Sequence, residues 1–456
     1  MTFAVLSGCT AYHAQPIAPA ALARQFEQRS LASEKLHAYV SREMGRDIAP
    51  WPPTRWNPDT LTLAAFYYSP ALDVARAQWE TAKAGIEVAD AVPNPVLQLP
   101  FQYNTPTPGP GSPFTIGAAL DIPIETAHKR GYRVGQASHL SEAASLNIAN
   151  EAWKVRSRVW AALVTLYAAR EQVAFLHKAA AAERQIAEMS KKRLAAGQFS
   201  QPDVDAAVLA DNKAQADLAA ARSAEEDARA QLAAAIGLPV AALDGIDVDL
   251  DTFGIVSAAP PPADARRDAL LHRADLLASL ADYAAAESAL QLEVAKQYPD
   301  IHLGPGYTYD TGTHKIAFGL AGITLPIFDR NQGGIREAEA KRKEAAARTA
   351  ALQDTLLGDL DHALAHYEAS LEALRLSDAH LADARKQVDA RHAAFAAGNA
   401  DRLTYTQALA DYEASEISRL DALIAVQRSA GTLEDTLQQP LAHGAASRSP
   451  NKAMPP

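Results

Sequence analysis

The sequence is poor in cysteine, in aromatic residues and in long hydrophobic runs, and each shortage argues against a class of protein. Cys9 is the one cysteine among 456 residues, which excludes a disulfide framework and a cysteine-rich metal cluster. No run reaches the roughly 18 apolar residues of a membrane-spanning helix, and the mean hydropathy is -0.15, which argues against a helical integral membrane protein. Acidic residues outnumber basic ones, 54 against 43, so we expect no nucleic-acid partner.

Motifs of common enzyme chemistry are missing as well. The sequence contains no glycine-rich phosphate loop, no G-x-S-x-G and no H-E-x-x-H. We therefore expect no enzyme and no cofactor. His362 and His366 are four residues apart and could direct two imidazoles toward one metal ion, but no third ligand follows at helical spacing. A solvated pair on a helix is the simpler interpretation, and it leaves no predicted metal site.

Alanine is abundant, and the chain repeats itself once. Low aromatic content with much alanine suits long, closely packed helices. Five landmarks recur in the same order at an offset of 201 to 204 positions, which is hard to attribute to chance. The pairs are Pro95/Pro299, Tyr103/Tyr307, Pro123/Pro326, Gly131/Gly334 and Gly197/Gly398. The proline-rich stretch 257–262 lies between the two copies and predicts a linker or turn.

Each copy is predicted to run helix, β-hairpin, long helix and returning helix. Proline ends the first helix, turn residues separate the strands, and no proline interrupts the long helix. Strand 300–309 alternates apolar and polar residues with period two. The predicted segments are helices 60–92 and 264–298, strands 96–103, 114–124, 300–309 and 315–327, long helices 127–195 and 334–396, and returning helices after Gly197 and Gly398.

Heptad spacing predicts how the helices pack. One core row of the second long helix is apolar throughout, and the other becomes polar toward its end. The first row is Leu360, Tyr367, Leu374, Leu381, Val388 and Phe395, and the second is Leu357, Leu364, Leu371, Asp378, Arg385 and His392. The returning helices carry rows seven residues apart, which predicts close neighbours. These rows are Ala207, Ala214, Ala221, Ala228 and Ala235, and Leu403, Ala410, Ile417 and Ile424.

The N-terminal Leu6-Ser7-Gly8-Cys9 is typical of a bacterial lipobox. Processing would make Cys9 the acylated first residue of an exported, lipid-anchored chain. Most of a signal segment does not precede it, so this interpretation expects a start farther upstream. A chance occurrence of these four residues is the alternative. With no aspartate after Cys9, the resemblance to other lipoproteins suggests the outer membrane.

Two repeats of this order behind a lipobox resemble the bacterial outer-membrane efflux proteins of the TolC type, over about residues 59–438. The fold class is accordingly mainly α with a small β part. The resemblance implies a homotrimer whose four strands per chain close a twelve-stranded transmembrane β-barrel, with a long α-helical coiled-coil barrel across the periplasm. It further implies an exit duct for drugs or metal ions, in which a periplasmic adaptor protein, an inner-membrane pump and outer-membrane lipid are the partners.

Gate residues follow from the same resemblance. The family turn runs from a glycine through five variable positions to Asp-Val-Leu and a further polar residue. After Gly197 this spacing gives Asp203-Val204, which makes Asp203 the best-matched gate candidate. After Gly398 the corresponding positions hold Thr404 and Gln407, with Asp401 three positions early. The second repeat therefore departs from the family pattern, which weakens the case for an acidic ring there.

The predicted organisation divides the chain into six parts, and the repeats fill most of it. In order they are the lipobox and signal remnant 1–9, an N-terminal segment 10–58, the first repeat 59–243, a linker 244–263, the second repeat 264–438 and a C-terminal tail 439–456. A periplasmic coiled-coil adaptor or scaffold without a pore is the alternative. Adaptors also have long helical hairpins, but little chain remains here for their additional β-rich domains, so we favour the channel.

Overall fold

The computed structural model describes residues 12–105, 112–256, 264–400 and 402–441. The chain divides into two compact units. Unit 1 comprises Met1–Ser69, Arg158–Gly254 and Leu409–Leu420, and unit 2 comprises Pro70–Ser157, Ile255–Ala408 and Asp421–Pro456. Helices α5 (Lys129–Ala195) and α10 (Arg402–Leu437) contribute residues to both.

Unit 1 is built around the segment for which the sequence predicted no structure. Its elements are α1 (Pro19–Glu27), α2 (Glu34–Met44), β1 (Arg55–Trp56), α3 (Pro58–Tyr68), the second part of α5, α6 (Gln201–Ile236), η1 (Val240–Leu243), β5 (Asp247–Val248), η2 (Asp251–Gly254) and the middle of α10. Strand β1 pairs in parallel with β5. Trp56 of β1 and Phe253 of η2 are fully buried. The Arg29 guanidinium donates to the carbonyls of Tyr68 (3.1 Å) and Gly237 (2.8 Å) at the ends of α3 and α6. The N-terminal segment therefore joins the core by capping helices of the first repeat.

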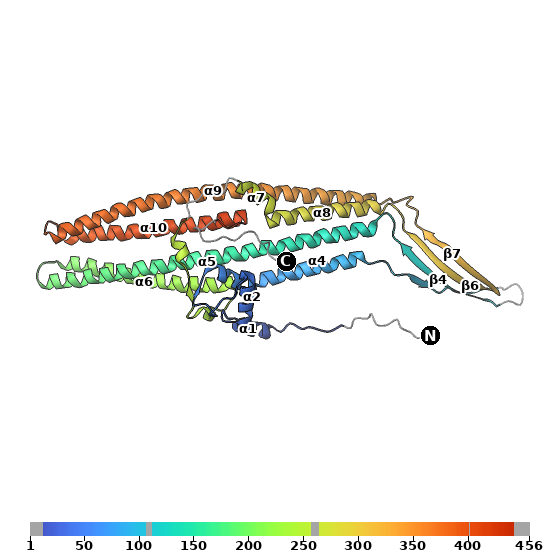
Figure 1. Ribbon diagram of the computed structural model, residues 1–456, viewed down its shortest axis with the longest axis horizontal. Helices are drawn as coiled ribbons and strands as arrows, with labels where there is room; N and C mark the ends of the chain where they lie inside the picture. Colours follow the sequence, from blue (N-terminus) through green and yellow to red (C-terminus); the bar gives the residue numbers. More distant parts are fainter. Residues whose placement is uncertain (1–11, 106–111, 257–263, 401, 442–456) are drawn as a thin grey trace. The chain divides into compact units, whose positions relative to one another are not determined.

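Unit 2 combines helices with a single antiparallel sheet. Its helices are α4 (Pro70–Asp90), the first part of α5, α7 (Ala265–His272), α8 (Ala274–Ala295), α9 (Gln332–Ala396) and both ends of α10. Helix α8 lies along α9, and the strands continue from the ends of α4, α5, α8 and α9 (Figure 1). None of the described helices has a stretch both long enough and apolar enough to cross a bilayer.

The first helix of each repeat is broken, where the sequence predicted one helix. Helix α3 ends before Ser69, whose backbone is extended (φ -73°, ψ 112°), and α4 starts at Pro70. Proline explains this break, because its ring disfavours helical geometry at the preceding residue. In the second repeat α7 and α8 separate at Arg273 (φ -64°, ψ 128°), which lies 204 positions after Ser69. No proline is present there, so the second break could not be predicted from the residues around it.

The two predicted hairpins form one sheet in the order β2-β4-β6-β7, with β3 also paired to β4. The strands are β2 (Val96–Gln98), β3 (Phe101–Tyr103), β4 (Phe114–Ile124), β6 (Ile301–Asp310) and β7 (Thr313–Ile323). The predicted strand 96–103 is interrupted at Pro100, which has no N–H to donate to the ladder. The last strand ends at Ile323, four residues before the predicted end. Thr311 and Gly312 (φ 47° and 101°) form the second turn, as suits a two-residue hairpin loop.

The long helices are present, but one predicted row of α9 is wrong. Leu360, Tyr367 and Leu374 of the first row are buried, and exposure increases toward Phe395. The second buried row is displaced by one residue from the prediction, because small side chains allow α10 to approach: the Ser370 and Ser429 hydroxyls are 2.7 Å apart. This row is Leu356, Ala363, Ser370 and Ala384, while Leu357, Leu364 and Leu371 are half-buried.

The packing positions predicted for α10 are also partly wrong, whereas those predicted for α6 are buried at the centre of the helix. Ala221 and Ala228 of α6 are buried, while the outer members of that row are half-buried. In α10 Ile424 is buried but Ala410 is exposed. Packing there uses other positions, again mostly small or aliphatic, which fit a close neighbour. They are Ala408, Ser415, Leu423, Ala430 and Leu437.

Candidate functional site

The sheet has two chemically opposed faces. The pairing register places Leu303 and Tyr307 of β6 on the same face as Ile316 and Leu320 of β7, because alternate residues of a strand point to the same side. Residues of β4 extend this apolar face, from Ile116 to Ile124 at even positions. We find the period-two alternation predicted for β6 in the neighbouring strands as well.

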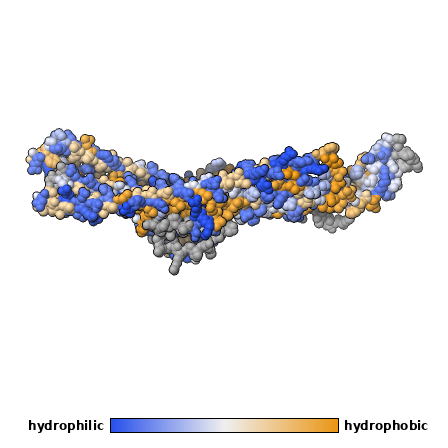
Figure 2. Space-filling view, turned by 90° about the horizontal axis from the view of Figure 1, so that it is seen from above, coloured by the Kyte–Doolittle hydropathy of each residue, from blue (hydrophilic) through white to orange (hydrophobic). Residues whose placement is uncertain are grey.

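The apolar face is exposed in the single chain. Ile316 is 85% exposed and Phe318 is 80% exposed, values far from those of a core. Figure 2 shows hydrophobic residues gathered where the sheet meets the helices of unit 2. Ile323, Leu325, Ile327 and Phe328 are exposed at this base, and Phe328 is 99% exposed. So large an uncovered apolar surface marks a region that contacts lipid or another protein.

The opposite face carries polar pairs that join the two repeats. His302 of β6 lies 2.9 Å from Asp121 of β4. The Thr115 hydroxyl of β4 donates to Asp310 of β6 at 2.7 Å, and Lys315 of β7 donates to the same carboxylate at 2.8 Å. Strands that are about 180 residues apart in the chain are thus fixed by side chains as well as by backbone hydrogen bonds.

An ion pair at the base of the sheet connects the first long helix to the second repeat. Lys129, the first residue of α5, is buried and donates from Nζ to Asp300 Oδ1 and to the Tyr298 carbonyl, both at 2.7 Å. Thr126 adds a backbone hydrogen bond to Asp300 at 2.9 Å. Burial opposes ionisation of Asp300, but the hydrogen bonds from Lys129 and Thr126 outweigh it and lower the pKa of that carboxyl.

Both long helices start with the same unusual backbone. His128 precedes α5 with φ 60°, and Asn331 precedes α9 with φ 61°. Each side chain lies over the glycine three residues later: a Cβ on Gly131 would be 2.0 Å from the His128 ring, and one on Gly334 would be 2.4 Å from Asn331 Oδ1. These glycines were landmarks of the repeat, and the structure supplies a physical reason, since a larger residue at either position would force the His128 or Asn331 side chain to move.

The turns at the far ends of the long helices share one geometry. Gly197 (φ 71°) and Gly398 (φ 73°) each end a long helix in the left-handed conformation. The next residue donates its N–H back to the helix, Gln198 to Arg193 and Asn399 to Ala394, at 2.9 and 2.8 Å. This is the Schellman arrangement, for which glycine is preferred.

The gate candidates lie at or near these turns. The Asp203 carboxylate accepts hydrogen bonds from the Ser200 hydroxyl (2.5 Å) and backbone N–H (3.0 Å), forming a capping box at the start of α6. These bonds, the hydroxyl first, lower the pKa of Asp203. On α10 Thr404 is half-buried and Gln407 is exposed. Asp401 and Cys9 lie outside the described residues. The turn at Gly197 belongs to unit 1, and the turn at Gly398 belongs to unit 2.

The predicted histidine pair lies on the surface of α9. His362 and His366 are exposed, their ring centroids are 6.2 Å apart, and the rings are inclined by 25°. Among the described residues, no group of three or more histidine, cysteine, aspartate or glutamate side chains is arranged to hold a metal ion. The structure thus places the two imidazoles next to each other on the exposed side of α9.

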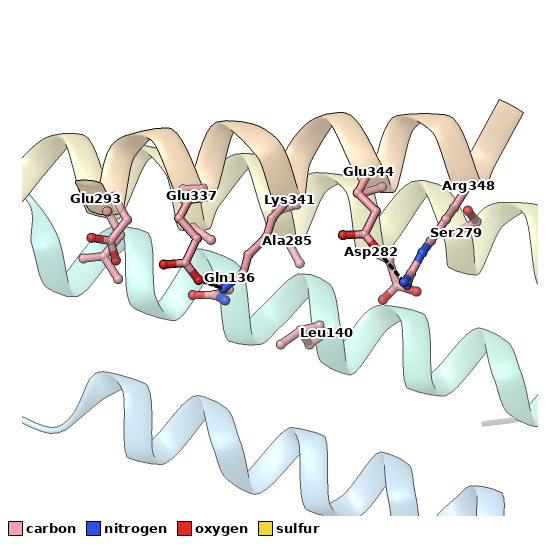
Figure 3. A pocket seen from close by; sticks show the side chains of 16 residues that line it. Gln136, Leu140, Ser279, Asp282, Ala285, Glu293, Glu337, Lys341, Glu344 and Arg348 are labelled. Atoms are coloured by element: carbon pink, nitrogen blue, oxygen red, sulfur yellow. Dashed lines mark hydrogen bonds and ion pairs between the residues drawn. The ribbon is translucent and has the colours of Figure 1, made fainter. Parts of the chain in front are cut away.

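A charged cavity of 790 Å³, which was not predicted from the sequence, lies on unit 2. It is lined by α5, α8 and α9 (Figure 3). Lys341 binds Glu337 at 2.7 Å, and Arg348 binds Glu344 at 2.5 Å, all on α9. Burial raises the pKa of Asp282 on α8, and the Arg348 charge opposes this shift. The sequence pattern that could have predicted this cavity is the spacing of four charged residues, which places them on one face of α9. They are Glu337, Lys341, Glu344 and Arg348.

Comparison with known proteins identifies the family pattern in this chain. The profile of the family described as outer membrane efflux protein matches twice, over residues 65–238 and 265–437. The cobalt-zinc-cadmium resistance protein CzcC of Cupriavidus metallidurans is 27% identical over 293 residues, covering 63% of this chain and 68% of that protein. The two profile matches coincide with the two structural repeats.

Solved structures share the fold at lower sequence identity. The outer membrane protein VceC of Vibrio cholerae has a TM-score of 0.69 at 19% identity, covering 84% of this chain and 96% of that one. CusC, solved in conformations that accompany folding and transmembrane channel formation, has a TM-score of 0.68 at 17% identity, with 86% and 94% coverage. The combination of a long-helical part and a small sheet is therefore a fold already seen in membrane channels.

Proposed function

Because the chain belongs to the outer membrane efflux protein family, we propose that it forms a trimeric channel, the exit duct of a tripartite efflux pump. The apolar face of the sheet is the observation that carries this proposal. Within the described residues the sheet ends at β2–β3 on one side and at β7 on the other. Four strand positions are too few to close on themselves, so copies of the chain supply the missing neighbours and form a barrel in the outer membrane.

The proposed cargo is divalent transition-metal ions. CzcC is named for resistance to cobalt, zinc and cadmium, and its similarity to this chain supports metal ions over drugs. The proposed partners are a periplasmic adaptor protein and an inner-membrane pump, which supplies the driving energy. The helices of the trimer would form the periplasmic tunnel, and this role requires no catalytic residue in the chain.

Two local roles complete the proposal. Cys9 would be acylated and would anchor the mature chain in the outer membrane. The residues at the far turns, Asp203 foremost with Asp401, Thr404 and Gln407, would hold the periplasmic end closed. Gly197 and Gly398 would allow the sharp reversals of the chain at that end. When the chain is exported behind a signal sequence, Cys9→Ser should abolish labelling by a fatty-acid probe and leave the sheet and helices folded.

The channel proposal is tested by assembly and by resistance. Outer membranes from cells that express the full chain should yield, after detergent extraction, a particle with three times the mass of one chain. Expression with its adaptor and pump should restore growth in zinc to a strain lacking its own metal-efflux channel. A monodisperse monomer that leaves with the soluble fraction would contradict the channel and favour a scaffold, and restored growth on drugs alone would contradict the metal cargo.

A further inference from the structure

We propose that His362 and His366 form a weak binding site for a divalent transition-metal ion on the same flank of α9 as the charged cavity. This inference deepens the proposed metal export by naming a place where the ion would bind, and it rests on that function for its physiological meaning. The site itself rests on the geometry of one helix in unit 2.

The geometry of the pair suits chelation. Residues four apart lie on one face of a helix, one turn from each other, and two histidines at this spacing are the helical zinc-binding arrangement of metalloproteases. The centroids are 6.2 Å apart. Imidazoles sharing a tetrahedral Zn²⁺, with Zn–N near 2 Å, would have centroids about 5 Å apart. Both side chains are exposed, so a small rotation of each ring can close this difference.

The position of the pair connects it to the cavity. Glu344 and Arg348, which line the cavity, precede His362 and His366 by 18 residues each. Eighteen residues are about five turns of helix, so the four side chains lie along one stripe. The opposite flank carries the half-buried leucines of the mispredicted row, and the buried rows lie between the two flanks.

The charge along this stripe favours cations. The cavity is lined by the acids Asp282, Glu293, Glu337 and Glu344 against the bases Lys341 and Arg348. Asp359, three residues before His362, adds an exposed carboxylate on the same face. A surface with an excess of negative charge raises the local concentration of divalent cations, while the imidazoles favour transition metals over Mg²⁺ and Ca²⁺.

A metal site with only two protein ligands binds the ion weakly and releases it readily. A structural zinc site has four protein ligands, and a catalytic one usually has three. With two imidazoles from the described residues, water occupies the other positions, and the ion can leave readily. Such a site suits the wall of a conduit, which must attract the ion without retaining it.

The site is tested with Zn²⁺ alone on the full-length protein in detergent. Competition against a chromophoric chelator should detect zinc binding that is weakened about tenfold or more in His362→Gln and in His366→Gln, at least the loss seen when an outer-shell partner is removed. The double variant should lose this zinc equivalent. His380→Gln is the matched control, because His380 follows His362 by a further 18 residues on the same stripe and should leave binding unchanged.

The outcomes separate this site from the proposed function. Unchanged zinc binding in the double variant, or an equal loss in His380→Gln, would overturn the site. Circular dichroism should show the same helix content in all variants, because these side chains are exposed. Zinc resistance measured in cells with wild-type chain tests the export function by itself: resistance without binding at the pair removes only the site, and binding without resistance removes only the function.

Discussion

The two repeats reach the same backbone by different chemistry. Each has a first helix broken at an equivalent position, by Pro70 in the first repeat and at Arg273 in the second. Each long helix begins after a residue with positive φ, which is His128 in one repeat and Asn331 in the other. The fold therefore requires a break in the first helix and a residue with positive φ before the long helix. Several kinds of residue can meet each requirement.

Arg273 shows how a side chain replaces proline. It is 8% exposed and forms a paired contact with Asp275, at 3.0 and 2.6 Å. Its guanidinium also donates to the carbonyls of Asp435 (3.3 Å) and Thr436 near the end of α10. A positive charge stabilises the carbonyl end of a helix, so the break in the second repeat is fixed by tertiary contacts.

The largest expected effect comes from breaking this arrangement. Arg273→Ala leaves Asp275 and the end of α10 without their buried cation, which should lower the free energy of unfolding by about 3–5 kcal/mol. Pro70→Ala at the equivalent place should cost less than about 1 kcal/mol, since it changes mainly the entropy of the unfolded chain. Urea unfolding in detergent, followed by circular dichroism, measures both, and equal losses would contradict the assignment.

The sheet offers the next test, within one strand. A Cβ on Gly304 would lie 1.5 Å from the Leu120 carbonyl oxygen, whereas a Cβ on Gly306 would lie 3.5 Å from Ala119. Gly304→Ala must move backbone and should cost about 1–3 kcal/mol, as overpacking does. Gly306→Ala should be tolerated. The temperature at which the detergent-solubilised protein loses its folded electrophoretic form should fall only for Gly304→Ala; a similar fall in both variants would exclude local crowding as the cause.

The ion pair between Lys129 and Asp300, which connects the two repeats, predicts that the stability of the fold depends on pH. The folded state lowers the pKa of Asp300, so its ionised form contributes stability above the unfolded-state pKa of about 3.9, and this contribution is lost as the pH falls through the lower folded-state pKa. Asp300→Asn should cost about 1–2 kcal/mol at pH 7, and the difference from wild type should vanish in acid. Asp73→Asn, in an exposed pair with Arg76, is the control and should change little at any pH.

The smallest expected effect concerns the first far turn. Asp203→Ala removes half of the capping box at the start of α6 and should lower the stability only slightly. If Asp203 also holds the periplasmic end closed, the variant should raise single-channel conductance in a planar bilayer. Asp217→Ala, which breaks an exposed pair with Lys213, should leave conductance unchanged. Reduced stability with wild-type conductance would show that Asp203 caps the helix and takes no part in the gate.

Sequence alone determined the features that depend on backbone chemistry or on period. Glycine marked the far turns, and the recurring landmarks predicted the duplication. The break before α4 was not predicted, although Pro70 explains it once it is seen. Alternation in β6 predicted a two-faced strand, and long stretches without proline predicted α5 and α9. These signals are local, because the conformational limits of proline and glycine and the repeat of a helix or strand act within a few residues.

Tertiary structure decided what depends on a neighbour. The break at Arg273 needs the end of α10, and the second buried row of α9 was set by the close approach of Ser429 to Ser370. Pairing of β4 with β6 and the ion pair of Lys129 with Asp300 join segments more than 170 residues apart. The cavity needs three helices. Such contacts depend on which faces of the helices and strands meet in the folded chain. Packing and charge across the whole unit determine this, and the local periodicity of the sequence does not encode it.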